Sequence, residues 1–322
     1  MSAVNVRELA LRVAAREPGA VARTISLVED RRPSAEGTTV ELLRALTEAS
    51  DPFRAARIGI TGPPGVGKST LVSALAKAAR ASGRTVGVLA VDPSSPRSGG
   101  ALLGDRARIE IDPADLGLFV RSMASGGELG GLARAASAAI DVLSAAYDVV
   151  LVETTGVGQS ETDVEHVADT VLLVIQPGSG DVLQFLKAGI IEIPDVFAVN
   201  KGDLGGIAER ALGELTAALA VAHSVNESDI PQVLLTSAST NAGVPELLAV
   251  LDGHRQGLVT AGKLRERRYR ALAAAAFRLF VHRWGEQGVA DVGGKTALLS
   301  RLERRVREGA TAVEAMSEMR PR

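Results

Sequence analysis

Cysteine is absent from all 322 residues of the sequence. Without thiols the chain cannot build a disulfide framework, a cysteine nucleophile or a thiolate metal site. The same absence fits a reducing compartment. We therefore expect the chemistry of this protein to rest on other side chains.

Long apolar runs are also missing, since no stretch approaches the roughly 18–20 residues that span a bilayer. No basic segment leads into an apolar one at the start of the chain, and Glu8 and Glu17 disfavour a transit peptide. The composition, 46% hydrophobic and 23% charged, is that of an ordinary globular protein. We expect a cytoplasmic protein with no membrane partner.

Charge is distributed unevenly, although the net charge is only −2. Residues 57–254 hold 13 basic and 23 acidic side chains, whereas residues 255–322 hold 15 basic and seven acidic ones. Aromatic residues do not interleave with the basic ones, so stacking on nucleic-acid bases is not indicated. We expect the basic tail to pack on its acidic neighbour domain or on a second subunit, and we expect no nucleic-acid partner.

The sequence pattern divides the chain into three regions. Residues 1–56 carry apolar side chains near helical spacing and predict two or three helices. Residues 57–253 alternate short β-branched runs with amphipathic segments, which predicts an α/β domain with a mostly parallel central sheet flanked by helices. Residues 254–322 lack a strand pattern and predict a helical extension.

Strands and helices are predicted in alternation in the second region, and helices alone in the third. The predicted strands are 57–61, 85–91, 117–121, 148–153, 170–176, 195–200 and 232–236. The predicted helices are 68–82, 129–146, 183–192, 206–222, 244–252, 263–285 and 294–309.

The segment 62–70 fits the phosphate-loop pattern, which is Gly, four residues and then Gly-Lys-Ser between a strand and a helix. Backbone N–H groups of such a loop surround phosphates, and the helix N-terminus adds positive potential. Lys68 would contact the β- and γ-phosphates, and the Ser69 hydroxyl would bind Mg²⁺. The predicted nucleotide-binding residues of this P-loop are Gly62, Pro63, Pro64, Gly65, Val66, Gly67, Lys68, Ser69 and Thr70.

A second motif, Asn-Lys-Gly-Asp at 200–203, has the guanine-reading pattern of GTPases. The Asp203 carboxylate can accept hydrogen bonds from the ring N–H and the exocyclic amine of guanine, whereas adenine would leave this carboxylate unpaired. Thr-Ser-Ala at 236–238, after the next strand, matches the backbone loop that contacts guanine in GTPases. The predicted guanine-binding residues are Asn200, Lys201, Asp203, Thr236, Ser237 and Ala238.

Acidic residues follow two of the predicted strands. Glu153 ends the strand 148–153, Asp92 follows the strand 85–91, and Asp105 is a third candidate. Carboxylate and hydroxyl oxygens are ligands that Mg²⁺ accepts. The predicted metal ligands are Ser69, Asp92, Asp105 and Glu153, and the predicted catalytic residues are Lys68, Asp105 and Glu153.

Gly156 follows Glu153 closely, and its N–H can reach the γ-phosphate. The next residue is Val157, so a water-orienting glutamine is missing from its usual place, with Gln159 nearby. Arg97 or a partner side chain could stabilise transition-state charge, but a plain surface arginine is the simpler interpretation of Arg97. The roles of Gln159 and Arg97 stay open.

Residues 252–257 spell Asp-x-His-x-x-Gly, the signature of cobalamin-ligating domains. In those domains the histidine follows a strand, whereas here it follows a predicted helix. The Gly-Gly and Ser-x-Leu elements of such sites also stand in the wrong order, at 293–294 and 300–302. We expect no direct cobalamin binding.

Several segments resemble the MeaB/ArgK family of GTPases. Val-Asp-Pro-Ser-Ser at 91–95, Ser-Gly-Gly at 98–100 and Leu-Gly-Asp at 103–105 look like its switch I region. Glu-Thr-Thr-Gly-Val-Gly-Gln-Ser-Glu at 153–161 is similar to its switch II, and the resemblance runs from about residue 20 to residue 250. The family's Mg²⁺, switch and P-loop residues carry over to Ser69, Asp92, Asp105, Glu153 and Lys68. Phe185 and Ala188 depart from the family's third switch.

This resemblance implies a P-loop GTPase that acts as chaperone for an adenosylcobalamin-dependent acyl-CoA mutase, most often methylmalonyl-CoA mutase. Such chaperones gate cofactor delivery and protect or reactivate the mutase, and the human member underlies the cblA form of methylmalonic aciduria. The resemblance also implies Mg²⁺, GTP as substrate, GDP as product, and a homodimer with the C-terminal helices at its interface.

Three other functions are weighed against this one. A metallochaperone GTPase would be expected to carry His- or Cys-rich metal tracts, which this chain lacks. A kinase of amino-acid transport proteins, of the LAO/AO type, is an older interpretation of the family. A GTP-dependent scaffold with negligible turnover is disfavoured by the intact set of Lys68, Ser69 and Glu153.

Overall fold

The computed structural model places a seven-stranded parallel sheet at the centre of the chain, in the order β3-β2-β4-β1-β5-β6-β7. The structure describes residues 5–30, 32–92, 115–124, 134–154, 164–178, 193–222 and 230–321. The strands are β1 (Ala56–Thr61), β2 (Val86–Asp92), β3 (Leu118–Ala124), β4 (Val149–Thr154), β5 (Thr170–Ile175), β6 (Val196–Val199) and β7 (Gln232–Leu235). All seven predicted strands are present.

Parallel pairing places every strand's carboxyl end at the same edge of the sheet. The register pairs Ile60 of β1 with Glu153 of β4 and with Leu172 of β5. The loop after β1 therefore starts beside the acidic end of β4. Open parallel sheets of this kind bind ligands at that edge.

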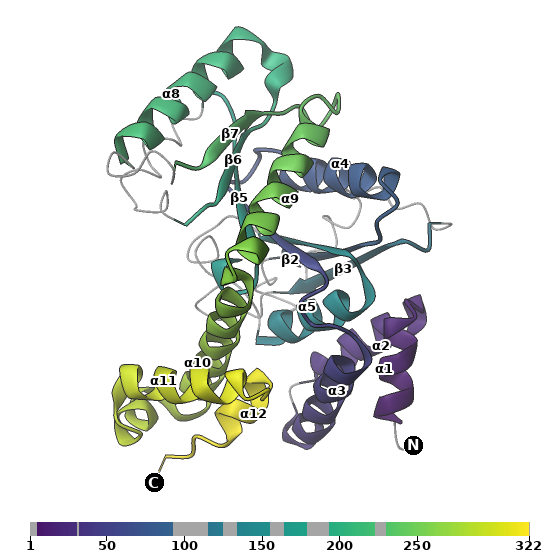
Figure 1. The fold of residues 1–322 in the computed structure, drawn as a ribbon, viewed down its shortest axis with the longest axis vertical. Helices are drawn as coiled ribbons and strands as arrows, with labels where there is room; N and C mark the ends of the chain where they lie inside the picture. Colours follow the sequence, from purple (N-terminus) through teal and green to yellow (C-terminus); the bar gives the residue numbers. More distant parts are fainter. Residues whose placement is uncertain are drawn as a thin grey trace, which may run out of the picture.

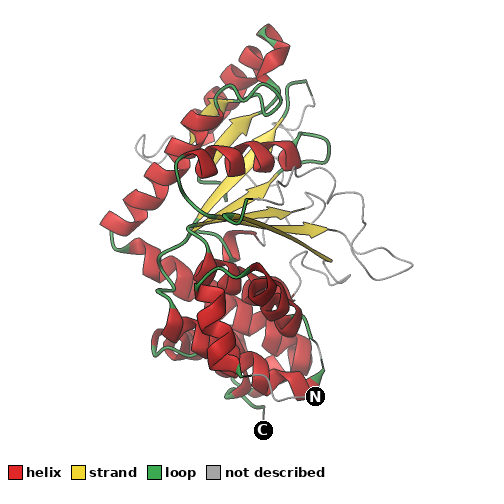
Figure 2. Ribbon diagram, turned by 90° about the vertical axis from the view of Figure 1, so that its right-hand side faces the viewer, coloured by secondary structure: helices red, strands yellow, loops and turns green. Residues whose placement is uncertain are grey.

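Helices cover both faces of the sheet, as predicted (Figures 1 and 2). One face packs on α4 (Lys68–Ala81) and α9 (Val244–Thr260) through residues such as Ile58 and Leu151. The other packs on α5 (Arg134–Ala146) through Val150 and Val152. At β5 to β7 this second apolar layer is continued by α8 (Gly206–Ala222).

The N-terminal region forms three α-helices, α1 (Val6–Ala14), α2 (Pro18–Val28) and α3 (Glu36–Ala49), with the 3₁₀ turn Pro33–Ala35 before α3. They share one apolar core with α5 and the adjoining sheet face, including Leu42 and Ile140. Figure 2 shows the terminal helices gathered below the sheet, with both chain ends on that side. The prediction of a helical extension at the N-terminus is confirmed.

The C-terminal region contains α10 (Lys263–Asp291), α11 (Gly294–Arg307) and α12 (Ala312–Ser317), which enclose a separate core around Phe280 and Leu302. Inside α10 the backbone of Gly285 leaves helical geometry, at φ 66°. Arg267 and Arg268 pair with Asp195 and Asp169 at 2.7 and 2.6 Å. Part of the basic tail thus packs on its acidic neighbour domain, as expected.

Some element boundaries differ from the prediction. The helix predicted to end at 252 continues through Gly253 and Gly257 to Thr260, so the cost of about 1 kcal/mol for a glycine within a helix does not end it there. The predicted boundary at 253/254 therefore falls inside one helix. The helix α12 was not predicted. The predicted helix 183–192 and the first residues of 129–146 lie outside the described residues.

Among the described residues, no helix is both long and apolar enough to cross a membrane.

Candidate nucleotide site

The P-loop follows β1 and opens α4, so Lys68, Ser69 and Thr70 form the first turn of a helix. Its backbone uses glycine where another residue would not fit. Gly62 has φ 144°, and a Cβ there would lie 2.1 Å from the Val174 carbonyl oxygen. Gly67 has φ 91° at the N-cap of α4. These glycines let the chain turn tightly between β1 and α4, so that the loop lies at the N-terminus of α4. A helix N-terminus with free backbone N–H groups is suited to binding anions.

Lys68 lies buried against the loop from which it would contact phosphate. Its Nζ donates to the carbonyl oxygens of Gly62 at 2.8 Å and Pro63 at 3.0 Å. The ammonium group is therefore held at the mouth of the P-loop. A phosphate entering the loop would meet this charge together with the N–H groups of the first helical turn.

Ser69 and Glu153 come together at the end of β4. The Ser69 hydroxyl donates to Glu153 Oε1 at 2.6 Å, and the Glu153 side chain is largely buried. A hydroxyl and a carboxylate at this distance form part of an oxygen donor set, which fits a small divalent cation such as Mg²⁺. Two of the four predicted metal ligands are therefore adjacent.

The other two predicted ligands cannot be placed. Asp92 is the last residue of β2, at the same sheet edge, but its side chain lies outside the described residues. Asp105, Gly156, Gln159 and Arg97 lie wholly outside them. Within the described ranges there is no group of three or more His, Asp or Glu able to hold a metal ion.

Asn200, directly after β6, joins the guanine motif to the P-loop. Its Nδ2 donates to the Val66 carbonyl oxygen at 2.9 Å, and its Oδ1 accepts from the Ala238 N–H at 3.1 Å. Oδ1 also accepts from the Thr236 hydroxyl at 3.4 Å. Because a Cβ at Gly67 would lie 2.6 Å from Asn200 Nδ2, this approach depends on a glycine there. The P-loop, the guanine motif at 200–203 and the loop at 236–238 are therefore all hydrogen-bonded to the side chain of Asn200 or contain it.

Lys201 also contacts the P-loop, and its backbone lies in the left-handed region at φ 61°. Its Nζ donates to the Gly65 carbonyl oxygen at 2.9 Å and to Gln176 Oε1 at 2.5 Å. Gln176 directly follows β5 and is not among the predicted site residues. No local motif marks it, since only the β1–β5 pairing brings it next to the P-loop.

Asp203 is held by the loop that follows β7. Its Oδ1 accepts from the Ser237 hydroxyl at 2.6 Å. The Ser237 hydrogen bond and the residue's own backbone N–H lower the pKa of the Asp203 carboxyl. The carboxylate is therefore ionised and exposed at neutral pH, ready to accept two N–H donors from one ligand edge.

His254, the centre of the cobalamin-like signature, lies in the middle of α9 and belongs to another cluster. Its Nδ1 is 2.9 Å from the Thr170 hydroxyl and its Nε2 is 3.4 Å from Asp195. Burial lowers the pKa of His254 despite Asp195 nearby. Both ring nitrogens are thus engaged at the amino ends of β5 and β6, away from the P-loop.

Comparison with known proteins decides the family. The sequence model of the family described as methylmalonyl Co-A mutase-associated GTPase MeaB matches residues 21–290. The chain belongs to the MeaB family. The resemblance seen in the switch-like motifs is therefore confirmed, and with it a P-loop NTPase fold.

Relatives from distant organisms agree with this membership. A Pyrococcus abyssi protein that carries the name GTPase is 45% identical over 271 residues, covering 82% of this chain and 80% of that protein. The GTPase ArgK of Escherichia coli is 34% identical over 262 residues, covering 78% and 76%. The mitochondrial methylmalonic aciduria type A homolog of Mus musculus is 38% identical over 215 residues, covering 66% of this chain and 52% of the mouse protein.

Among solved structures, one described as an LAO/AO transport system kinase superposes with a TM-score of 0.69 at 26% identity. It covers 98% of this chain and 99% of its own. The helical extensions at both ends of this MeaB-family chain are therefore part of a fold already seen in a crystal.

Proposed function

We propose that this MeaB-family protein hydrolyses GTP with Mg²⁺ at the P-loop edge of its sheet. The observation that carries the proposal is the 2.6 Å contact between Ser69 Oγ and Glu153 Oε1 beside the buried Lys68 ammonium. Asp203, held by Ser237 at the far side of the same edge, supports guanine as the base. The family's description and the names of its relatives support GTP hydrolysis at family level.

Each residue has a defined task in this proposal. Lys68 leaves the carbonyl oxygens of Gly62 and Pro63 to bridge the β- and γ-phosphates. Ser69 and Glu153, with Asp92 and Asp105, would hold the cation, which would supply positive charge beside the phosphate oxygens. Lys201 supports the base plane, and Asp203 accepts from the guanine N–H groups.

The proposal extends to a partner, an adenosylcobalamin-dependent acyl-CoA mutase, with methylmalonyl-CoA mutase as the first candidate. The family's description names that mutase, and a mouse relative's name refers to methylmalonic aciduria. GTP hydrolysis would gate cofactor loading and protect or reactivate the mutase. The chain would bind no cobalamin itself.

Turnover is expected to be slow without the partner. Val157 stands where a water-orienting glutamine is usual, so the attacking water lacks its customary hydrogen-bond acceptor. A partner side chain, or Gln159, would supply the missing orientation.

We also propose a cytoplasmic homodimer in which residues 254–322 contribute to the interface, residues 57–253 form the GTPase domain and residues 1–56 form an N-terminal extension.

A second candidate function is phosphoryl transfer to a protein. It is favoured by the structure described as an LAO/AO transport system kinase, which resembles this chain over nearly its full length. A phosphoryl acceptor would then replace water at the γ-phosphate. Radiolabel transferred from nucleotide to an acceptor protein would distinguish this reaction from hydrolysis, and binding without turnover would indicate a scaffold.

The test is steady-state release of phosphate from GTP with Mg²⁺, by the protein alone and with purified methylmalonyl-CoA mutase. We expect slow release that rises several-fold with the mutase, and no release from a Lys68→Ala variant. Release that ignores every acyl-CoA mutase tested would contradict the chaperone role but not the GTPase activity. No release under any condition would contradict both.

A further inference from the structure

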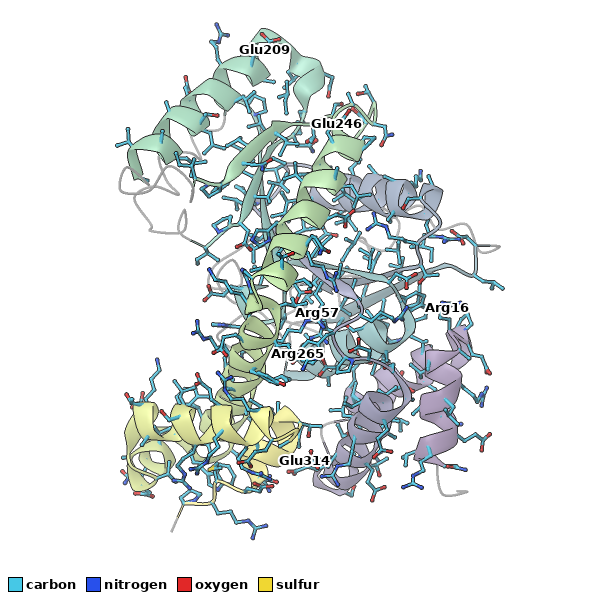
Figure 3. All side chains as sticks on the ribbon, viewed as in Figure 1. Arg16, Arg57, Glu209, Glu246, Arg265 and Glu314 are labelled. Atoms are coloured by element: carbon cyan, nitrogen blue, oxygen red, sulfur yellow. The ribbon has the colours of Figure 1, made fainter. Side chains whose placement is uncertain are left out.

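A cavity of about 250 Å³ lies beside the amino end of β1, whereas the P-loop follows the carboxyl end of that strand. Its walls come from α3, α5, α10, the turn between α11 and α12, and the segment that enters β1. Exposed residues, among them Thr47, Pro52 and Gly309, form the mouth, and buried ones, among them Leu46 and Arg268, form the floor. Figure 3 labels Arg57, on the cavity wall, near the centre of the molecule.

The wall is mostly hydrocarbon, and most of its hydroxyl groups are already hydrogen-bonded. Thr47 and Ser50 donate to the Leu43 and Leu46 carbonyl oxygens of their own helix at 3.0 Å. Ser144 likewise donates to the Ile140 carbonyl oxygen at 2.7 Å. Aliphatic and aromatic side chains make up most of the remaining wall, so an occupant would be apolar over most of its length. The apolar wall residues include Leu43, Leu46, Phe53, Ala145, Leu272 and Val306.

Two guanidinium groups line the cavity, and they differ in how fully they are paired. Arg268 donates to both carboxylate oxygens of Asp169 and to the Ala55 carbonyl oxygen, all within 2.7 Å. Arg57, 9% exposed, donates from Nη2 to Asp141 at 2.8 Å, while its buried Nε has no partner among the described residues. A guanidinium has five N–H donors, so Arg57 retains capacity for an acceptor.

The wall also carries one carboxylate, Asp141, which pairs with Arg57, while Arg268 is paired with Asp169. Burial, followed by the positive charge of Arg268, lowers the pKa of Arg57, whereas the carboxylates of Asp141 and Asp169 oppose this shift. Asp141 is itself partly exposed, at 28% of its side chain. A carboxylate placed against Arg57 would supply negative charge and hydrogen-bond acceptors in one group.

We propose that this cavity binds a small aliphatic monocarboxylate, with its hydrocarbon chain against α3, α5 and α10 and its carboxylate on Arg57. A dry cavity of about 150 Å³ holds benzene, so by proportion this cavity accommodates roughly ten non-hydrogen atoms. Octanoate has that size and carries one negative charge. The occupant would join the N-terminal helices to α10 and α11 at a place that no nucleotide contact reaches.

The experiment is calorimetric titration of the full-length, nucleotide-free protein with octanoate, octan-1-ol and octylammonium. We expect octanoate to bind at least about tenfold more tightly than the other two, because a hydrogen bond to a charged group is worth that much. An Arg57→Met variant should remove the difference. Arg84→Met is the matched control, since Arg84 also pairs with one aspartate, Asp252, at 2.8 Å, but lies outside the cavity.

A second pair of variants keeps the test independent of the buried Arg57. Thr47→Trp would fill the mouth and abolish octanoate binding, whereas Glu48→Trp, next to it on α3 but not on the cavity wall, should preserve it. Equal affinity for octanol and octanoate, no binding of octanoate, or binding that survives Thr47→Trp would overturn the proposal. If octanoate fails to bind wild type and the Thr47→Trp protein changes its oligomeric state, the cavity is covered by a second copy of the chain. That outcome also overturns the proposal. None of these readouts depends on GTP hydrolysis.

Discussion

The side-chain amide of Asn200 donates to the carbonyl oxygen of Val66 at 2.9 Å, although 134 residues separate the two. Val66 lies in the P-loop and Asn200 in the guanine motif, so one hydrogen bond joins the phosphate end of the site to the base end. Oδ1 of the same side chain accepts a hydrogen bond from the Ala238 N–H. The shape of the site is therefore set jointly by loops that follow β1, β6 and β7.

Replacing Asn200 should damage all three loops together. Asn200→Ala leaves the Val66 carbonyl and the Ala238 N–H without their partner, which costs about 1–3 kcal/mol for each group that stays buried. We expect weaker GTP binding by at least about tenfold and a lower free energy of unfolding, measured by fluorescent-nucleotide titration and urea denaturation. Unchanged affinity would contradict the joint role of this amide.

Ser69 and Glu153 should act together on the metal requirement. Ser69→Ala and Glu153→Gln each remove one oxygen ligand or its charge, so the Mg²⁺ concentration for half-maximal GTP turnover should rise about tenfold or more. Thr70→Ala, on the next residue of the same helical turn, is the control and should leave that concentration near the wild-type value. Equal Mg²⁺ dependence in all four proteins would contradict the ligand assignment.

Arg268 should be much more important for stability than Arg270 on the same helix. Arg268 and Asp169 form a buried pair, and removing one partner of such a pair typically costs about 3–5 kcal/mol. Arg270 pairs with Glu266 at an exposed i,i+4 position, which is worth about 0.5 kcal/mol at most. Arg268→Leu should therefore lower the unfolding free energy far more than Arg270→Leu. Similar losses in chemical denaturation would contradict this.

His166 should make stability depend on pH in mildly acidic solution. Partial burial, followed by the charge of Arg278, lowers the pKa of His166 from 6.5 to about 4 in the folded chain, although Nε2 lies 3.5 Å from Glu165 Oε1. As pH falls through this interval, the unfolded chain binds the proton before the folded one, so the free energy of unfolding decreases. A His166→Gln variant should lose less stability between pH 6.5 and pH 4.5 than wild type. Parallel curves for the two proteins would show that His166 does not contribute.

The sheet was predictable because its strands are continuous apolar runs. Val149–Thr154 and Thr170–Ile175 are buried on both faces, and such runs stand out without any knowledge of tertiary structure. Strand ends were less predictable. The strand predicted as 117–121 runs to Ala124, because Ser122 and Met123 pair with Ala90 and Val91 of β2. That extension is decided by a neighbouring strand.

Features created by contacts distant in sequence were missed. Gln176 gains its place beside Lys201 only through sheet pairing, and Asp169 meets Arg268 across 99 residues. In contrast, α12 had a local signal that could have found it, since Thr311 and Glu314 form a capping box at its start. The helix is only six residues long, too short to show a periodic apolar stripe.

The assignment of Asp203 as the residue that reads guanine can be tested by nucleotide preference, with the change confined to that side chain. This carboxylate accepts from the guanine N–H groups in our account, whereas the side-chain amide of an Asp203→Asn variant would donate to the second carbonyl of xanthine. We would measure Mg²⁺-dependent phosphate release from GTP, XTP and ATP by wild type and by Asp203→Asn. We expect wild type to prefer GTP and Asp203→Asn to prefer XTP, each by at least about tenfold. Equal use of ATP and GTP by wild type, or GTP preference that survives Asp203→Asn, would contradict this assignment.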